Sequence, residues 1–306
     1  DFPNWWQTHM ASHKTFCDDS VKAFHAALAK GLKPESLQMF LRQSDRLFDQ
    51  FKATEFGLLE MLQNNNHWMV EGGVGTGKTF LALKQAEFLA EEGEGRSVLF
   101  LVYNLLLAER LKRMVGRFKL KRGSVTVLSW EELLGQIIAT RGLELENPQA
   151  PDALKTYFEE ELPSYVAMAF EEGEVPLKFD ALVIDEAQDH DTSGIGGVAL
   201  GWWSWYFNLL REGTEAQIAI YYDQAQRSAF RGAENFDPER LREFIGGAVH
   251  LKLSKALRYT MPIYNYLKTL RADATKHLVD AIEAHDGLPT GPEVIQRKAD
   301  ERQVKE

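Results

Sequence analysis

The sequence contains a single cysteine, Cys17, among 306 residues. One cysteine excludes an intramolecular disulfide framework and a zinc site built from cysteine thiolates. This usage is typical of a reducing cytosol, where a lone cysteine more often packs as a small apolar side chain than acts as a nucleophile. We therefore predict a cytoplasmic protein. Its 44% hydrophobic residues are enough for a sizeable core.

Long apolar runs are also scarce, and none reaches the length that spans a bilayer. The nearest candidate, residues 194–210, is uncharged but opens on several glycines. Within it, Trp202, Trp205 and Tyr206 recur at helical spacing, which indicates the buried face of a helix. Residues 1–6 do not combine a basic segment with an apolar run, so we predict neither a signal peptide nor a membrane partner.

Positive charge is in deficit, since 45 acidic residues face 35 basic ones and the formal net charge is −10. Such a balance argues weakly against a nucleic-acid partner, but net charge averages over the surface and a local basic groove can coexist with it. One basic cluster is present in the middle of the chain. Its members are Arg110, Lys112, Arg113, Arg117, Lys119, Lys121 and Arg122. The cluster is either a solvated helix face or a contact for phosphates.

A glycine-rich segment, residues 72–79, matches the phosphate-binding pattern G-x-x-x-x-G-K-S/T. A strand-like run precedes it at 67–70, and a helical pattern follows at 80–89. In that context backbone amides turn inward around an anion, and the helix start adds its positive end. We expect Lys78 to reach the β- and γ-phosphates of ATP and Thr79 to place its hydroxyl on Mg²⁺. The expected nucleotide-binding residues of this segment are Gly72, Gly73, Val74, Gly75, Thr76, Gly77, Lys78, Thr79 and Phe80.

Short apolar runs alternate with helical patterns along the chain. The runs predict strands at 97–102, 125–128, 181–184, 217–222 and 249–253. Near-continuous apolar strands are expected where helices cover both faces of a parallel sheet. The alternation therefore predicts an α/β fold with a doubly wound parallel sheet.

An acidic pair, Asp185 and Glu186, stands at the end of the predicted strand 181–184. Ligands of open α/β sheets bind beyond the carboxyl ends of the strands, so this pair is expected to face the phosphate-binding loop. We expect Asp185 to hold the Mg²⁺ shell and Glu186 to orient or deprotonate the attacking water. The sequence therefore predicts a Mg²⁺-dependent nucleotide-hydrolysing site.

The sequence Asp-Glu-Ala-Gln-Asp at 185–189 resembles the second signature of the UvrD/Rep-type helicases of superfamily 1. Further segments resemble that family in its order: Ia at 98–111, Ib at 126–134, III at 220–226 and IV at 253–260. The resemblance covers roughly residues 52 to 270. It implies a RecA-like P-loop NTPase lobe, the first motor lobe of a helicase that uses ATP and Mg²⁺ and moves along single-stranded DNA or RNA.

The resemblance also implies roles for single residues. Gln226 of segment III would sense the γ-phosphate, and Arg258 of segment IV would neutralise charge on the transferred phosphoryl group. Leu257 would pack on the base, where the family usually has a tyrosine. The residues that would line a track for one nucleic-acid strand are Tyr103, Asn104, Ser129 and Trp130. For Tyr103 and Trp130, the sequence favours ordinary core or edge aromatics over a place in such a track.

The chain departs from the family at its base-reading positions and after segment IV. Phe56 stands where the family has a glutamine that reads adenine, and no segment matches motifs V and VI of a second RecA-like lobe. We expect a helical N-terminal segment at 1–62 and a RecA-like lobe at 63–272 with a helical insertion at about 131–178. A C-terminal helix and linker at 273–306 would lead to a second lobe, in the same chain or in trans.

Two functions from different classes are compatible with these features. The first is the motor lobe of an ATP-dependent helicase or translocase, with a fused or associated nuclease as a further partner, because residues 40–51 resemble the segment that joins a NERD nuclease domain to such helicases. The second is a nucleotide-gated interaction module that moves no strand. A small-molecule kinase is a weaker third reading, because such kinases rarely combine these acidic, glutamine and arginine positions.

Overall fold

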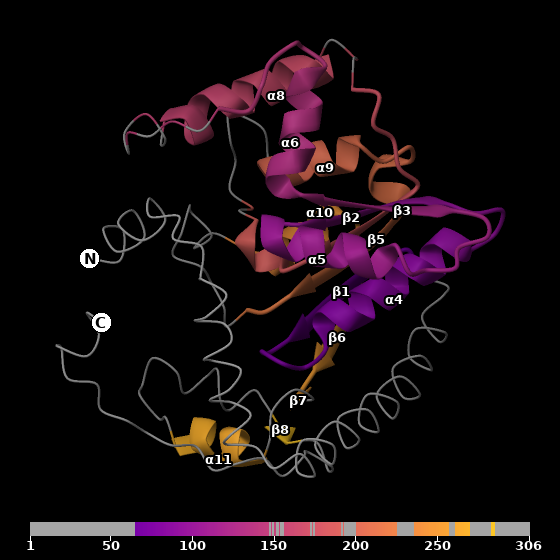
Figure 1. The fold of residues 1–306 in the computed structure, drawn as a ribbon, viewed down its shortest axis with the longest axis vertical. Helices are drawn as coiled ribbons and strands as arrows, with labels where there is room; N and C mark the ends of the chain where they lie inside the picture. Colours follow the sequence, from indigo (N-terminus) through magenta and orange to yellow (C-terminus); the bar gives the residue numbers. More distant parts are fainter. Residues whose placement is uncertain are drawn as a thin grey trace, which may run out of the picture.

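Figure 1 shows the protein as a computed structural model. The structure describes the following residues: 65–146, 148, 150, 153, 156–171, 173, 175–190, 192, 200–224, 236–256, 261–269 and 283–284. The predicted N-terminal helices, Phe56, Gln226, Leu257 and Arg258 lie outside these residues, as does most of the predicted C-terminal linker. The division of the chain into three parts stays a prediction.

The described residues form a six-stranded parallel sheet in the order β3-β2-β4-β5-β1-β6. Its strands are β1 (His67–Gly72), β2 (Ser97–Val102), β3 (Ser124–Ser129), β4 (Ala181–Asp185), β5 (Gln217–Tyr222) and β6 (Val249–Leu253). A short separate pair joins β7 (Lys255–Ala256) to β8 (Glu283–Ala284). The parallel sheet with its helices confirms the predicted α/β fold.

Helices cover both faces of the sheet (Figure 1). One face is covered by α4 (Lys78–Glu91) and α5 (Leu105–Val115). The other face is covered by α6 (Trp130–Ala139), α8 (Leu162–Glu171), α9 (Trp202–Asn208) and α10 (Pro238–Phe244), with a π-helical turn η1 (Tyr157–Glu161) before α8. The remaining helical pieces are the 3₁₀ turns η2 (Ala187–Asp189) and η3 (Gly213–Glu215) and the helix α11 (Met261–Thr269).

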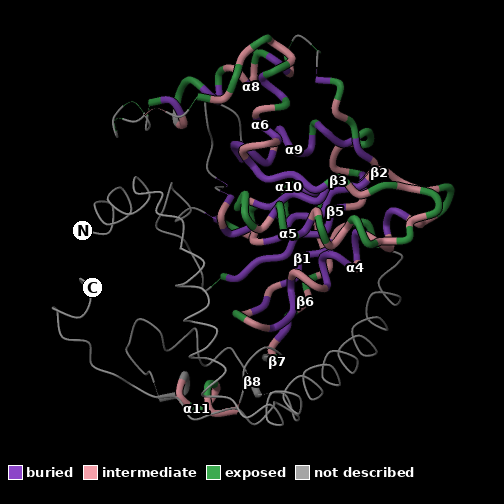
Figure 2. The backbone as a smooth tube through the Cα atoms, in the orientation of Figure 1, coloured by how far each residue is buried: buried purple, intermediate pink, exposed green. Residues whose placement is uncertain are grey.

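The two faces of the strands carry separate hydrophobic cores. Along β1, Trp68 and Val70 pack with α4, whereas Met69 packs with the core under α6 and α9. Successive side chains of a strand point to opposite faces, so a strand buried on both sides needs apolar residues at nearly every position. This is why the sequence shows continuous apolar runs, and Figure 2 shows the sheet as the buried centre of the molecule.

Helix α9 confirms the predicted buried aromatic face. Trp202, Trp205 and Tyr206 are all buried and belong to the core on that side of the sheet. Among the described residues, no helix combines the length and apolar character that crossing a membrane requires.

Helix starts differ in a way that bears on function. Asn104 accepts hydrogen bonds from the amides of Leu106 and Leu107, and Ser129 forms a reciprocal capping box with Glu132. These side chains satisfy amides that a helix start otherwise leaves unpaired. Helix α4 has no side-chain cap, and Gly77 at its N-cap is left-handed. In this respect the start of α4, which follows the glycine-rich loop, differs from the starts of α5 and α6.

Candidate nucleotide-binding site

All strands of the sheet end at one edge, which we name the carboxyl edge, and begin at the opposite amino edge. At the carboxyl edge, β1 leads into the phosphate-binding loop, β4 ends at Asp185, and Asp223 follows β5. Because β5 lies between β4 and β1, the loop and the acidic pair flank one strand. This is the position where open α/β sheets bind their ligands.

The phosphate-binding loop is held in shape by its own backbone and side chains. The Thr76 hydroxyl donates to the carbonyl of Gly73 at 2.8 Å, and Gly75 and Gly77 have φ values of 78° and 95°. Positive φ is accessible to glycine at little cost, so these two positions suit no larger residue. The buried Lys78 ammonium donates to the carbonyls of Gly72 (2.7 Å) and Gly73 (3.1 Å). The loop thus keeps its lysine folded back over its own carbonyls.

Asp185 is fully buried, and neither of its carboxylate oxygens accepts a hydrogen bond of ordinary geometry from the described residues. Burial, and then the charge of Glu186, raises the pKa of this carboxyl from 3.8 to about 7. The Thr79 hydroxyl and the Lys78 ammonium lie close enough to act against that rise. Lys78, Thr79 and Asp185 therefore lie close together at the carboxyl edge.

The donor set around Asp185 fits a magnesium ion. A buried carboxylate without a partner, beside a hydroxyl, offers the hard oxygen ligands that Mg²⁺ prefers. Magnesium is usually held by one or two carboxylates together with substrate phosphates. Accordingly, the described residues hold no group of three or more His, Cys, Asp and Glu side chains suited to a metal ion.

Glu186 adopts a backbone conformation that is uncommon outside glycine, with φ 56° and ψ 43°. Such left-handed residues cost on the order of 1–3 kcal/mol and concentrate at functional sites. The Glu186 side chain is partly exposed and accepts a hydrogen bond of 2.6 Å from the amide of Gln188. Close by, burial and the charge of Glu186 raise the pKa of Asp189 to about 6. The acidic end of β4 is therefore strained and electrostatically crowded.

Asp223 connects the loop to the acidic segment. Its carboxylate lies 3.6 Å from the Lys78 ammonium, and its backbone amide donates to the Gln188 side chain at 2.9 Å. The sequence pointed to Asp223 only through its match to segment III, and it gave Gln188 no role at all. The feature of the sequence that could have indicated a role is that Gln188 is neutral, can both donate and accept a hydrogen bond, and stands within the acidic segment 185–189. Gln226, which follows Asp223 in the same segment, lies outside the described residues.

The four residues predicted to line a nucleic-acid track fall into two groups. Ser129 and Trp130 are buried: the Ser129 hydroxyl caps α6, and the Trp130 ring stacks on Tyr103 with centroids 5.4 Å apart. Tyr103 is partly exposed and Asn104 is exposed, directly after the carboxyl end of β2. Of the four, these two offer accessible surface at the edge that carries the loop.

The basic cluster does not gather at the nucleotide site. Lys112 pairs with Glu109 and Glu132, and Arg122 lies against the end of α4, where it donates to the carbonyl of Gly93 at 2.6 Å. Residues 117–122 are therefore at the amino edge, where Figure 2 shows them as largely exposed. Contact of residues 117–122 with phosphates requires that nucleic acid reach the amino edge, whereas Lys112 is paired with Glu132 near the start of α6.

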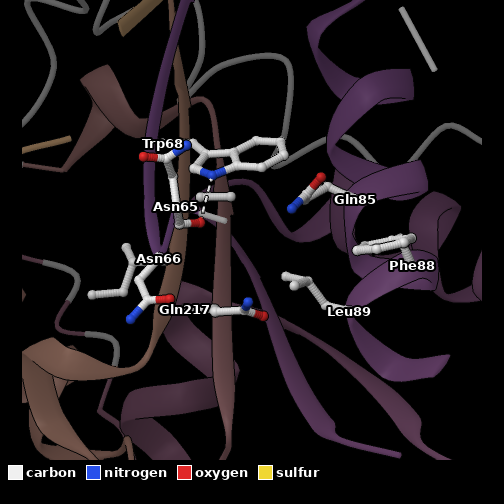
Figure 3. Close-up of a pocket in the computed structure, with 9 residues that line it drawn as sticks. Asn65, Asn66, Trp68, Gln85, Phe88, Leu89 and Gln217 are labelled. Atoms are coloured by element: carbon white, nitrogen blue, oxygen red, sulfur yellow. Dashed lines mark hydrogen bonds between the residues drawn. The ribbon is translucent and has the colours of Figure 1, made fainter. Parts of the chain in front are cut away.

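A small cavity lies at the amino edge between β1, β5 and α4 (Figure 3). Asn65, Trp68, Gln85 and Leu89 are among its lining residues, and the Trp68 indole donates to the carbonyl of Asn65 at 2.9 Å. It has room for about one water molecule, and the buried Gln85 oxygen has no hydrogen-bond partner among the described residues. Its size and position separate it from the nucleotide site.

Comparison with protein families matches residues 33–194 to the type III restriction enzyme res subunit family (ResIII). Comparison with curated proteins found no match. The matched segment contains the phosphate-binding loop, Asp185 and Glu186, and the family is a helicase-like P-loop group of superfamily 2. The P-loop and helicase character is confirmed at that level, whereas the assignment to superfamily 1 stays a prediction. The matched segment spans more than half of the chain. The chain therefore belongs to the ResIII family of helicase-like, ATP-dependent nucleic-acid motors.

Proposed function

We propose that this chain is the first motor lobe of an ATP-dependent translocase of the UvrD/Rep type that acts on single-stranded DNA. The observation that carries the proposal is the proximity of the buried Lys78 and Asp185 to each other and to Thr79 at the carboxyl edge. Family membership supports ATP-dependent motor activity in general terms. The order of the segments along the chain supports the finer assignment.

We assign the chemistry to the chain's residues as follows. The amides of the loop and of the uncapped start of α4 bind the phosphates, and Lys78 exchanges its loop carbonyls for the β- and γ-phosphates. Thr79 and Asp185 would hold Mg²⁺, which supplies charge neutralisation during phosphoryl transfer. Glu186, which has a left-handed backbone and a partly exposed side chain, orients and deprotonates the attacking water.

The remaining roles follow from the family resemblance alone. Gln226 would sense the γ-phosphate, Arg258 would neutralise the transferred phosphoryl group, and Leu257 would pack on the base. These residues would complete the site together with a second RecA-like lobe, in the same chain or in trans. A fused or associated nuclease fits the same protein type. We also keep the lobe boundaries of 63–272 as part of the proposal.

The nucleic-acid track is proposed to run over the carboxyl end of β2. Tyr103 offers a partly exposed ring for base stacking, and Asn104 is exposed beside it. Leu105 and Leu106, 45% and 79% exposed, extend this surface with apolar contacts. The same contacts would serve RNA, so a DNA preference is the part of the proposal that a competition between the two polymers decides.

The decisive experiment measures the Mg²⁺-dependent ATPase rate of the intact gene product with and without single-stranded DNA. We expect stimulation by the strand, and loss of both basal and stimulated rates in Lys78→Ala. A Tyr103→Ala variant should keep the basal rate and lose stimulation. An ATPase that ignores every nucleic acid would overturn the motor assignment and favour the nucleotide-gated interaction module.

A further inference from the structure

We propose that Gln188 is a positioning residue that sets the orientation of the Glu186 carboxylate and makes it depend on nucleotide at the loop. The inference rests on the proposed role of Glu186 as the residue that activates water. In the proposed hydrolytic site, the Gln188 side chain contacts neither the phosphates nor the metal. It therefore acts on catalysis through its neighbours.

The Gln188 side chain makes two hydrogen bonds in opposite senses. Its nitrogen donates to the Glu186 carboxylate at 2.6 Å, and its oxygen accepts from the backbone amide of Asp223 at 2.9 Å. Gln188 is only 2% exposed, so water does not substitute for either partner. A primary amide carries a donor and an acceptor side by side, which a carboxylate or an apolar side chain does not. The position therefore requires this chemistry.

Glu186 needs external support to hold one orientation. Its backbone is left-handed, and the turn that follows is closed by the amides of Asp189 and His190, each 3.0 Å from its acceptor. Buried contacts anchor the end of that turn, since His190 meets the Tyr206 hydroxyl at 2.9 Å and its carbonyl accepts from Trp203. Within this fixed turn, the hydrogen bond from Gln188 directs the carboxylate.

The same side chain links the acid to the loop lysine. The backbone amide of Asp223 donates a hydrogen bond to Gln188, and the Asp223 carboxylate lies 3.6 Å from the Lys78 ammonium. Lys78 is now held by the carbonyls of Gly72 and Gly73, and a triphosphate would draw it away from them. Asp223 loses or changes its ion pair at that moment. Through its two hydrogen bonds, the Gln188 side chain links this change at Asp223 to Glu186.

The test compares Gln188→Met and Gln188→Glu with the unaltered gene product. Gln188→Met keeps the length and removes both hydrogen bonds, so kcat should fall at least about tenfold while KM for ATP changes less than about twofold. Gln188→Glu keeps an acceptor for Asp223 but replaces the donor to Glu186 with a second carboxylate, so it should also lower kcat at least about tenfold while KM for ATP changes less than about twofold. A purely structural role would lower kcat only in proportion to the loss of folded protein, which thermal unfolding of the same variants measures.

A matched control is Gln85→Met, because Gln85 is also a buried glutamine but lies at the amino edge. It should keep both kcat and KM for ATP. In a Glu186→Gln background, Gln188→Met should cause no further loss of rate, because both act through the same carboxylate.

The outcomes separate the two proposals. If Gln188→Met and Gln188→Glu both retain the full kcat, while Lys78→Ala is inactive, the positioning role is wrong and the hydrolytic site stands. If Gln188→Met loses further rate in the Glu186→Gln background, Gln188 acts elsewhere and the inference is also wrong. If the unaltered gene product has no Mg²⁺-dependent ATPase, the proposed function fails and the inference fails with it.

Discussion

The two ends of strand β4 carry aspartates whose pKa values shift in opposite directions. At the amino edge, Asp180 accepts hydrogen bonds from the Ser97 amide (2.7 Å), the Ser97 hydroxyl (2.8 Å) and Arg211. Burial alone would raise the pKa of Asp180, but these bonds outweigh it and hold the pKa below the usual 3.8. At the carboxyl edge, burial and the charge of Glu186 outweigh the opposing effects of Thr79, Lys78 and the Glu186 amide, and the pKa of Asp185 rises to about 7.

This difference shows at which edge of the sheet the polar groups are already paired in the absence of a ligand. A satisfied buried carboxylate stabilises the native state, whereas an unsatisfied one destabilises it until a partner arrives. At the carboxyl edge Asp185 is unsatisfied, Glu186 is strained and Lys78 is bound to its own loop. At the amino edge Arg96 is also paired, with Glu92 and Gln217. Substitutions should therefore cost activity at one edge and stability at the other.

The largest effect is expected at Lys78. Lys78→Ala removes the charge that meets the phosphates, and loss of one such group from a preorganised site costs about 10²-fold or more in rate. It also removes the donor to the Gly72 and Gly73 carbonyls and the cation beside Asp223, so a loss of stability of about 1–3 kcal/mol should accompany the larger loss of rate. ATPase kinetics and thermal unfolding of the same variant measure the two effects. A variant that loses rate only in proportion to lost folded protein would contradict the comparison.

Asp185→Asn should abolish hydrolysis and stabilise the ligand-free protein. Between about pH 4 and pH 7 native Asp185 keeps a proton that the unfolded chain releases, so the free energy of unfolding falls as pH rises through this window. Asparagine removes this dependence. The gain should grow with pH and level off above pH 7, at roughly a few kcal/mol. Denaturant unfolding of both proteins from pH 4 to pH 8, without Mg²⁺, tests the sign; an equal pH dependence in the two would contradict it.

Gly72→Ala should weaken nucleotide binding by distorting the loop. A Cβ at Gly72 would lie 2.6 Å from the Thr76 hydroxyl and 3.1 Å from the Leu253 Cβ. Moving that hydroxyl breaks its bond to the Gly73 carbonyl, and overpacking of this kind typically costs about 1–3 kcal/mol. Isothermal titration with an ATP analogue should show a roughly tenfold weaker affinity.

The matched control for that substitution is Gly135→Ala in helix α6. A Cβ there meets nothing within 4 Å, and alanine in a helix interior stabilises by about 0.5–1 kcal/mol relative to glycine. Unchanged nucleotide affinity in Gly135→Ala, beside a loss in Gly72→Ala, would locate the effect in the loop. Equal affinities in the two variants would show that the loop tolerates the added methyl group.

The sequence was informative wherever one local pattern determined the outcome. The strands β2, β5 and β6 have the predicted bounds, because short apolar runs that alternate with helices are typical of the strands of a parallel sheet. The loop and Asp185 were predictable because spacing and strand ends fix them. Asn104 and Ser129 were assigned to a nucleic-acid track, but here their side chains cap helices. Local spacing does not distinguish a cap from a ligand contact.

What the sequence could not supply is pairing across the sheet. The role of Gln188 depends on Asp223, and the two residues meet only because β5 lies beside β4. Burial of Trp130 likewise depends on Trp202, whose ring approaches it edge-on with centroids 5.3 Å apart. The rise of the Asp185 pKa depends first on its burial, which the packing around β4 produces. These features follow from tertiary neighbours, for which no single segment carries a signal.

The smallest effect is expected at the amino edge. Asp180→Asn should lower stability by about 1 kcal/mol or less, because Asp180 and Arg211 are partly exposed and solvent screens their attraction. Since the pKa of native Asp180 lies below 3.8, its contribution is complete above that value and is lost as pH falls through the native pKa. The stability difference between Asp180→Asn and the unaltered protein should therefore vanish in strong acid. ATPase activity should stay unchanged at neutral pH, because the substitution lies at the opposite edge from Lys78. A rate loss larger than the loss of folded protein would show that the two edges are coupled through β4, which would break the comparison.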